Sequence, residues 1–499
     1  MKNFTFPALW LAPLFALFAV LLSACGGGGG GGDSGTTTPT TPVAVTLRSI
    51  AITAPSTTLL VGGATQTYTA TGTYTDGSTK ALTGLTWTTK SGGSTVVQVT
   101  SAGIVSGRSI GTESVIATQP AAGTVAAVSG SVDVTSIAPW TQVAAGGNQT
   151  IALKTDGKLY SWGLNIQGQL GDGTNTQRNT PVTVAGNSTI WKQVAVGDSF
   201  AVAIRTDGTL WSWGNNLFGQ LGQGDQLPRT VPTQVGVAKN WTYVAVGKSH
   251  VVALSTTAAT TGPAVVSLWV WGNNYASQLG DGTTVDLLVP TRLGTDSWLA
   301  VAAGDAHTIA IKRSDQSLWT WGDNTYGQLG NGTTGAKVGV PTQVGTANWS
   351  AVAAGSRHSL AIRNDDGVLF AWGAGESGQV GNNSTNLQSS PTQISDASAR
   401  WTQVAGGVSH SIGVRNDGTL WTWGRGVEGQ LGQTVAGSLM PLQVGSLRTW
   451  KAVAAGANHS AALQTDGNNL SLWTWGQNTD GQLGNGNNAN APAPVSIAY

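Results

Sequence analysis

The sequence contains little charge and almost no sulfur. Charged residues make up only 9% of the 499 residues, and the 24 basic residues nearly balance the 23 acidic ones. The single cysteine excludes an intrachain disulfide and a cysteine-rich zinc site. The balanced charge leaves no overall electrostatic field that would attract nucleic acid. We therefore expect a protein with no nucleic-acid partner.

Glutamate is also scarce, since it occurs only at Glu113, Glu376 and Glu428. Glutamate is a strong helix former, so its near absence argues against a large helical protein. Glycine, in contrast, occurs 71 times and tryptophan 21 times. A hydrophobic share of 40% argues against a disordered chain. The composition predicts an all-β protein whose turns are marked by glycine.

The N-terminus has the features of a secretory signal. Lys2 precedes an apolar run that ends in Leu22-Ser-Ala-Cys25. Pro7 and Pro13 interrupt the run and argue against a membrane span. The last four residues resemble the bacterial lipoprotein signal. This resemblance implies removal of residues 1–24, lipid attachment at Cys25 and an exported protein at the cell envelope. Gly26 after the cysteine implies the outer membrane.

Residues 25–44 and 45–137 differ in composition. The first segment holds seven successive glycines followed by Ser, Thr and Pro, which predicts a flexible tether. The second alternates apolar and polar residues in short stretches, turns at Asp76-Gly77 and predicts a β-sandwich with Trp87 in its core. Through Ser49-Ile-Ala-Ile52 and Tyr74-Thr-Asp-Gly-Ser78 it resembles bacterial immunoglobulin-like domains of group 2. That resemblance implies a spacer or an adhesion module, and we favour a spacer.

Residues 138–499 repeat one phrase seven times, at intervals of about 50 residues. Each copy runs Trp-x-x-Val-Ala-x-Gly, then His-x-x-Ala, Asp-Gly, Leu-Trp-x-Trp-Gly and Gly-Gln-Leu-Gly, and ends near Pro-x-x-Val. Four short strands in each copy are typical of the blades of a propeller. Large tryptophan side chains between neighbouring blades supply the buried area. The copies open at Trp140, Trp191, Trp241, Trp298, Trp349, Trp401 and Trp450.

The phrase resembles the regulator of chromosome condensation repeat family, whose fold is a seven-bladed propeller. The resemblance covers Trp140 to Tyr499 and implies guanine-nucleotide exchange on a small GTPase and contact with chromatin. It departs from the pattern locally: Ser277 replaces the first glycine of Gly-Gln-Leu-Gly in the third copy. If the final segment Pro494-Val-Ser-Ile497 forms a strand of the next blade, it pairs with the first blade and closes the ring.

All five histidines occupy one column of the repeat, where Gln149 and Phe200 take their place in the first two copies. Equivalent residues of different blades lie around a ring, so we favour a structural role over a metal site. The Gly171-Asp-Gly173 type of turn lacks the ligands of a calcium loop. No set of catalytic residues converges, and we expect no metal, no cofactor and no enzymatic activity. The histidines are His250, His307, His358, His410 and His459.

Two variable residues precede Gly-Gln-Leu-Gly in each copy. They are apolar or aromatic in the first four blades and acidic in several of the others, so we expect an interaction surface if they share one face. The alternative is that each pair packs on the edge of its own blade. The candidate binding face consists of Ile166, Leu217, Phe218, Tyr275, Tyr326, Glu376, Glu428 and Asp480.

The leading functional hypothesis is a monomeric, lipid-anchored envelope protein whose propeller captures a protein partner, displayed on an immunoglobulin-like stalk. The signal segment and the equal numbers of acidic and basic residues in the propeller, 19 of each, support it. The first alternative is a guanine-nucleotide exchange factor-like regulator of a small GTPase. The second is an extracytoplasmic enzyme with its site in the propeller channel.

Overall fold

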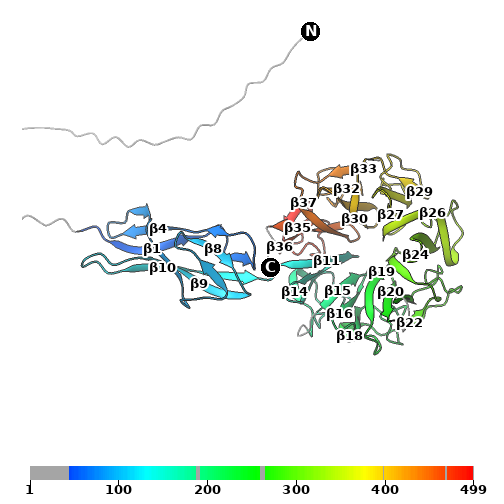
Figure 1. The fold of residues 1–499 in the computed structure, drawn as a ribbon, viewed down its shortest axis with the longest axis horizontal. Helices are drawn as coiled ribbons and strands as arrows, with labels where there is room; N and C mark the ends of the chain where they lie inside the picture. The colour runs from blue at the N-terminus through cyan, green and yellow to red at the C-terminus, as the bar shows by residue number, and fades with distance from the viewer. Residues whose placement is uncertain (1–43, 187–190, 259–263, 397, 467–468, 498–499) are drawn as a thin grey trace, which may run out of the picture. The chain divides into compact units, whose positions relative to one another are not determined.

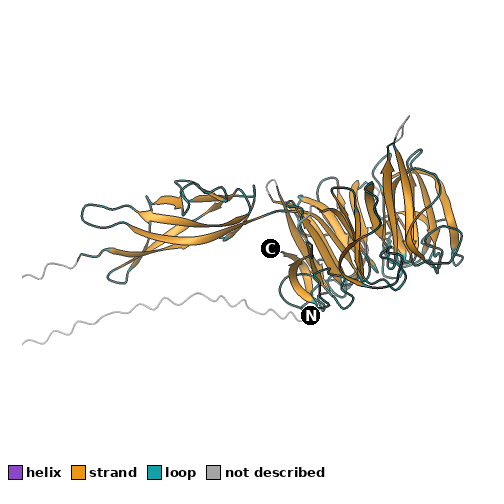
Figure 2. Cartoon of the chain, turned by 90° about the horizontal axis from the view of Figure 1, so that it is seen from below, coloured by secondary structure: helices purple, strands orange, loops and turns teal. Residues whose placement is uncertain are grey.

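The computed structural model describes residues 44–186, 191–258, 264–396, 398–466 and 469–497. Residues 1–24, Cys25 and most of the predicted tether lie outside these ranges. Every regular element in them is a β-strand (Figure 2), as the composition predicted. None of the described residues forms a helix that could cross a membrane.

Ten strands between residues 47 and 137 pack as a sandwich. They pair in the orders β1-β4-β5, β2-β10-β9-β6 and β3-β8-β7, and only β2 runs parallel to its neighbour β10. Gly77 turns the β4–β5 hairpin with φ +84°, as Asp76-Gly77 predicted. The strands are β1 (Leu47–Thr53), β2 (Thr58–Leu60), β3 (Gln66–Thr67), β4 (Thr69–Tyr74), β5 (Thr79–Ala81), β6 (Thr86–Thr89), β7 (Val97–Val99), β8 (Ile104–Gly107), β9 (Gly111–Gln119) and β10 (Val128–Ile137).

The core of the sandwich differs from the sequence prediction in its aromatic residue. Tyr68 is the buried aromatic, 2% exposed, and packs with Val105 and Val115. Its hydroxyl donates to the carbonyl of Ser56 at 2.6 Å, which satisfies the polar end of the ring. Trp87 is half-buried and packs against the core from its side. The immunoglobulin-like group 2 assignment stays a prediction.

Seven four-stranded sheets follow, arranged as the blades of a propeller (Figure 1). The first strand of each blade is innermost and the fourth outermost, since the ends of the first strands line the axial channel. Strand β26 (Val338–Ala354) is shared: residues 338–348 pair as the fourth strand of blade four, and residues 349–354 as the first strand of blade five. The seven-bladed propeller predicted from the repeats is confirmed.

The strands of the blades occupy four concentric positions. The innermost are β11 (Trp140–Gly146), β15 (Trp191–Val196), β19 (Trp241–Val246), β23 (Trp298–Ala303), β26, β30 (Trp401–Gly406) and β34 (Trp450–Ala455). The second are β12 (Gln149–Lys154), β16 (Phe200–Arg205), β20 (His250–Thr257), β24 (His307–Lys312), β27 (His358–Arg363), β31 (His410–Arg415) and β35 (His459–Asp466). The third are β13 (Leu159–Gly163), β17 (Leu210–Gly214), β21 (Val265–Gly272), β25 (Ser317–Gly322), β28 (Leu369–Gly373), β32 (Leu420–Arg425) and β36 (Asn469–Gly476). The outermost are β14 (Arg178–Thr183), β18 (Arg229–Gln234), β22 (Leu287–Arg292), β26, β29 (Gln388–Gln393), β33 (Gly437–Gln443) and β37 (Ala491–Ser496).

The C-terminal strand does not close the ring in the way that the sequence suggested. Strand β37 pairs with β36 of its own blade, with Ser496 opposite Trp473. The Pro-x-x-Val segment is thus the fourth strand of the repeat that contains it. Blades seven and one meet instead through a short antiparallel pairing of β11 with β36, in which Trp140 lies opposite Leu470. Packing adds to this contact, because Ile497 and Leu472 share a buried cluster with Trp140.

Tryptophan residues fill the interfaces between blades, as predicted. Trp213 of blade two is fully buried and packs on Ile151 and Leu159 of blade one. Its Nε1–H donates to the carbonyl oxygen of Gln169 in the Gly-Gln-Leu-Gly loop of blade one, at 3.0 Å. The corresponding indole of every blade makes the same hydrogen bond to the glutamine of the preceding blade. The tryptophans are Trp162, Trp213, Trp271, Trp321, Trp372, Trp423 and Trp475.

Candidate functional site

The loops with the variable residues lie at one end of the propeller. Successive strands of a blade are antiparallel, so the turn between its first two strands and the loop between its last two lie at the same end. We call this end the loop face. In blade two, Asn215 links the loop between the last two strands to the turn between the first two, because its backbone N–H donates to the carbonyl of Ser199, at 2.9 Å. Asn273 bonds in the same way to Ser249 in blade three.

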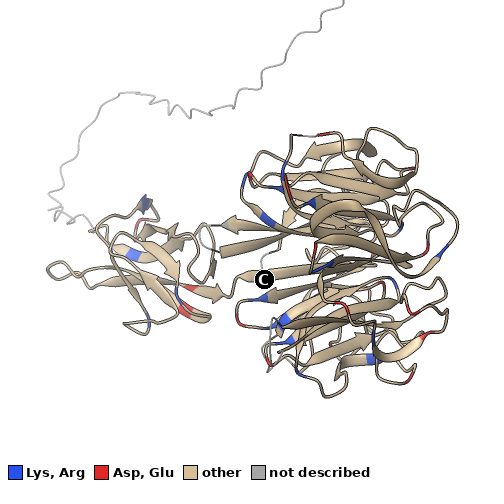
Figure 3. Cartoon of the chain, turned by 45° about the vertical axis from the view of Figure 1, so that its right-hand side comes forward, with Lys and Arg blue, Asp and Glu red and all other residues tan. Residues whose placement is uncertain are grey.

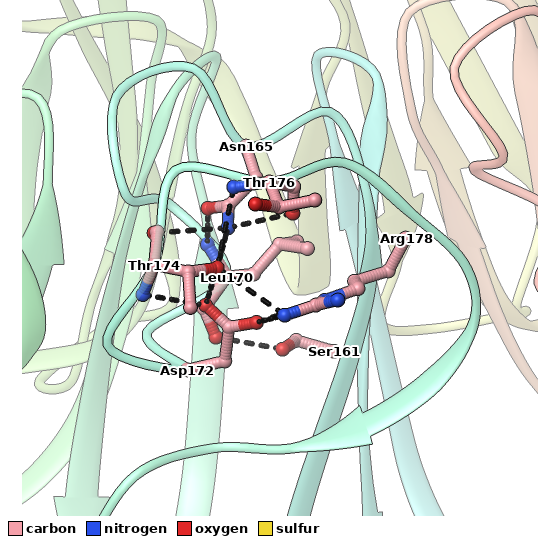
Figure 4. Close-up of polar contacts among 7 residues, drawn as sticks. All are labelled: Ser161, Asn165, Leu170, Asp172, Thr174, Thr176 and Arg178. Carbon is pink, nitrogen blue, oxygen red and sulfur yellow. Dashed lines mark hydrogen bonds and ion pairs between the residues drawn. The ribbon is translucent and has the colours of Figure 1, made fainter.

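An asparagine side chain holds each long loop in shape in five of the blades. In blade one, the Oδ1 of Asn165 accepts the N–H of Leu170 at 2.9 Å, and its Nδ2 donates to the carbonyls of Thr174 and Thr176, both at 3.0 Å (Figure 4). Ser161 of β13 donates to the carbonyl of Leu170, at 2.6 Å. In four other blades the N–H of the corresponding leucine donates to the Oδ1 of an asparagine. These asparagines are Asn216, Asn274, Asn324 and Asn478.

The Gly171-Asp-Gly173 turn is filled by protein donors. Asp172 Oδ1 accepts the N–H and hydroxyl of Thr174, and Oδ2 lies 2.8 Å from Arg178 Nη2 (Figure 4). Burial alone would raise the pKa of this carboxyl, but the hydrogen bonds from Thr174 and Arg178 hold it below its ordinary value. The turn therefore stabilises the loop. The described residues contain no group of three or more His, Cys, Asp or Glu side chains placed to hold a metal ion.

The two variable positions of each blade have different surroundings. The first position is exposed: Ile166 is 63%, Leu217 62% and Tyr275 66% exposed. Glu376 is exposed as well. Val427, at the same position in blade six, is 64% exposed. The first positions therefore form an exposed ring on the loop face, as the interaction-surface hypothesis required.

The second position is half-buried in six blades and buried in blade three, and three of its side chains contact other protein groups. The Tyr326 hydroxyl accepts Arg357 Nη1 of the next blade at 3.0 Å. Asp480 accepts Asn148 Nδ2 of blade one at 2.9 Å. Glu428 pairs with Arg425 Nη2 at 2.5 Å, and Phe218 is half-buried too. The contacts of Tyr326, Asp480 and Glu428 hold loops in place, so the first positions are the more exposed part of the candidate binding face. Binding at this face stays a prediction.

An axial channel with a volume of about 190 Å³ opens between the innermost strands. Its wall is mostly glycine and alanine, but the turns of blades two to five contribute Asp198, Lys248, Asp305 and Ser356. Ser356 donates its hydroxyl to the Asp305 carboxylate. The channel wall and the nearby Asp305 raise the pKa of Asp198, and Lys248 opposes that rise. The sequence reasoning did not select these residues, although they follow the Val-Ala-x-Gly motif in every repeat.

The histidines form bridges between blades. His459 Nε2 lies 2.9 Å from the Thr150 hydroxyl oxygen, and Thr150 donates its own proton to the carbonyl of Gln482, at 2.8 Å. The hydroxyl hydrogen is thus committed, so Nε2 carries a proton and donates it. The same arrangement joins four further pairs. They are His250 with Thr308, His307 with Ser359, His358 with Ser411 and His410 with Ser460.

Burial keeps all five histidines neutral. Burial lowers the pKa of His250, His358 and His459 to about 3, and that of His307 and His410 to about 4. Each Nδ1 is buried and has no hydrogen-bond partner. A second proton on Nδ1 would be a buried, unpaired donor, which explains the direction of the shift. The histidines are structural, as predicted.

Comparison with known families identifies the propeller. Residues 106–365 match the RCC1-like domain, which is just over half of the chain, and residues 366–414, 417–463 and 471–499 match the regulator of chromosome condensation (RCC1) repeat. The chain belongs to the RCC1-like family. RCC1-like membership accounts for the seven repeats and for the propeller, while the sandwich strands before residue 106 lie outside the match.

Several characterised proteins resemble this RCC1-like chain. The ultraviolet-B receptor UVR8 of Arabidopsis thaliana is 32% identical over 58% of the chain and 66% of its own length. The E3 ubiquitin-protein ligase HERC2 of Homo sapiens is 30% identical over 64% of the chain but only 7% of its own length. An X-linked retinitis pigmentosa GTPase regulator homologue of Caenorhabditis elegans is 27% identical over 58% of the chain and 24% of its own length. The chain thus spans less than two thirds of these relatives.

Among solved structures, Prp20p of Saccharomyces cerevisiae is similar, with a TM-score of 0.56 and 25% identity over 64% of this chain and 80% of its own. Prp20p is described with its binding properties to Gsp1p and histones. Human WBSCR16, with a TM-score of 0.59 and 22% identity over 68% of this chain and 94% of its own, shares the fold.

These comparisons contradict the leading hypothesis of a lipid-anchored envelope binding protein. The relatives include a receptor and a GTPase regulator homologue, and Prp20p binds Gsp1p and histones. They support the first alternative, an exchange factor-like regulator. The expectation of a protein partner agrees with Prp20p. Because HERC2 is a ligase, the expected lack of enzymatic activity stays a prediction.

Proposed function

We propose that the propeller is a protein-binding regulator that promotes guanine-nucleotide exchange on a small GTPase. Its membership of the RCC1-like family and its likeness to a GTPase regulator homologue and to Prp20p support this. The observation in the structure that favours it is the exposed ring of first-position side chains on the loop face, represented by Leu217 and Tyr275. Exposed apolar side chains gathered at one end of a rigid ring are typical of protein-binding surfaces.

The proposal is tested by release of a fluorescent GDP analogue from Gsp1p, the protein that Prp20p binds. Catalytic amounts of this chain should accelerate the release in the presence of excess GTP. A variant with Leu217→Ser and Tyr275→Ser should lose most of the acceleration, because both side chains are exposed and contribute little to folding.

The matched control changes two exposed apolar residues at the opposite end of the propeller. Val237, 90% exposed, and Leu447, 49% exposed, lie between the fourth strand of one blade and the first strand of the next. The Val237→Ser and Leu447→Ser variant should retain the exchange activity. Equal loss in both double variants, or no acceleration by the unchanged protein, would contradict the proposal.

Export and acylation of Cys25 remain separate predictions, because residues 1–43 lie outside the described ranges. Growth of the source cells with an alkyne analogue of palmitate tests them directly. Labelling that disappears in a Cys25→Ser variant supports the lipid anchor, and an unlabelled chain in the soluble fraction contradicts it. An exchange factor and its GTPase must share a compartment. Separation of the labelled cells into soluble and membrane fractions therefore also defines which GTPases are accessible to this chain. The monomeric state also stays a prediction.

A further inference from the structure

Exposed apolar side chains of the loop face form one group on blades one to three and a second on blade six, where Val408, Val427 and Val435 are exposed. Ile166, Leu217 and Tyr275 occupy the first variable positions of blades one to three. Leu227, 63% exposed, and Val285, 66% exposed, lie later in the same loops of blades two and three. We call these five residues the apolar crescent. The first position of blades four, five and seven is instead Thr325, Glu376 or Thr479.

Charged residues of the channel mouth lie beside the crescent. Asp198 precedes Ser199, the residue that holds the Leu217 loop through Asn215. Lys248 likewise precedes Ser249, which holds the Tyr275 loop through Asn273. The crescent and the mouth are therefore parts of one continuous surface, and the charges in Figure 3 are otherwise sparse and scattered.

The mouth has more carboxylates than ammonium groups. Asp198 and Asp305 contribute two carboxylates and Lys248 one ammonium group, while the equivalent residues of blades six and seven are Val408 and Ala457. Asp305 accepts the Ser356 hydroxyl. Within the described residues, the structure records no hydrogen bond to the Asp198 carboxylate, which Lys248 attracts and Asp305 repels. A cation entering the mouth would be attracted by both carboxylates.

The size of the channel limits what enters it. A channel volume of about 190 Å³ is on the scale of one side chain. An α-helix, which is about 10–12 Å wide with its side chains, is therefore too large to enter it. Lys and Arg have long apolar stems that suit a wall of glycine and alanine, and they carry their charge at the tip. A single basic side chain therefore fits both the size and the charge of the mouth.

We propose that the loop face binds a protein segment in which one lysine or arginine is flanked by aliphatic or aromatic residues. The basic side chain enters the channel mouth between Asp198 and Asp305, and the flanking residues pack on the apolar crescent. This inference rests on the proposed protein-binding role of the loop face and names the chemistry of the partner. It does not depend on whether the partner is a GTPase.

A displayed library of random twelve-residue peptides, selected on the immobilised full-length protein, provides the test. The enriched peptides should share a lysine or arginine between apolar residues at a constant spacing. A synthetic peptide of the enriched sequence should bind at least tenfold more weakly when its basic residue is replaced by glutamine. The Asp198→Asn and Asp305→Asn double variant should bind the original peptide at least tenfold more weakly, and so should the Leu217→Ser and Tyr275→Ser variant.

The Val237→Ser and Leu447→Ser variant is the control, because its changes lie at the other end of the propeller. It should bind the peptide as the unchanged protein does, and unaltered melting temperatures of all variants confirm that they fold. No enrichment, enrichment of acidic or purely apolar peptides, or equal binding by the Asp198→Asn and Asp305→Asn variant would overturn the inference. Each of these results leaves the GDP-release assay unaffected, so failure of the two proposals is distinguishable.

Discussion

His459 of the last blade donates a hydrogen bond to Thr150 of the first blade, across 309 positions of sequence and 2.9 Å of space. Five such bridges join successive blades from blade three around to blade one. The first two blades carry Gln149 and Phe200 in the histidine column, and the residues that face them, Ala201 and Val251, have no hydroxyl group. Histidine therefore occurs where the next blade supplies a serine or threonine.

Removal of the Thr150 hydroxyl should weaken the junction between the last and first blades. Thr150→Ala leaves the Nε2–H of His459 buried without an acceptor, which costs about 1–3 kcal/mol. Equilibrium unfolding in guanidinium chloride measures the loss. The pair Gln149 and Ala201 shows how an interface without the bridge is built, so adding His459→Gln should recover part of the stability. A double variant less stable than Thr150→Ala alone would contradict this explanation.

The histidines should make the propeller sensitive to mild acid. Their pKa values in the folded protein, about 3 to 4, lie below the ordinary value of 6.5. The unfolded chain therefore binds more protons below pH 6.5, and the stability that is complete above pH 6.5 declines as the pH falls toward 4. Thermal unfolding between pH 8 and pH 4 measures this.

The acid dependence has its own control. His459→Gln removes one of the five titrating groups, so its stability should fall less steeply between pH 6.5 and pH 5. A variant with the same slope as the unchanged protein would show that other groups cause the acid sensitivity. Asp366, whose bond from Arg363 lowers its pKa to about 2, titrates below this window.

Ser277 should be replaceable by glycine with a gain in stability. It has φ +61°, where the other blades have glycine with φ +73° to +88°. A residue with a Cβ loses about 1–2 kcal/mol of stability in left-handed backbone, a cost that glycine avoids. Glycine in turn loses about 0.5–1 kcal/mol, because it is more flexible in the unfolded chain. Ser277→Gly should therefore raise the stability by about 0.5–1 kcal/mol, measured by thermal unfolding.

The reverse change in blade one provides the contrast. A Cβ at Gly168 would lie 2.8 Å from the Thr230 Cα of the next blade. In blade three the facing residue is Gly339, and even a Cβ added there would lie 3.9 Å from the Ser277 Cβ, an ordinary van der Waals distance, so this junction is less crowded. Gly168→Ser should thus be clearly destabilising. A neutral Gly168→Ser, or a destabilising Ser277→Gly, would contradict this explanation.

The fold could be predicted from the sequence because the same turn and strand motifs occur in all seven copies of the repeat. Asp-Gly marked the hairpin turns, with Gly157 and Gly208 at φ +78° and +80°. The predictions that failed concern residues whose neighbours lie on another blade. Tyr326 and Asp480 are half-buried because Arg357 and Asn148 reach them from the next blade. Alignment of each repeat with its successor would have revealed the histidine–hydroxyl pairs, but not the charges of the channel mouth.

Release of a fluorescent GDP analogue from Gsp1p by the unchanged protein and by its Leu217→Ser and Tyr275→Ser variant tests the central claim most directly. The account predicts acceleration by the unchanged protein, its loss in this variant, and its retention in the Val237→Ser and Leu447→Ser variant. A release rate equal to that of Gsp1p alone, with the protein folded, would contradict it.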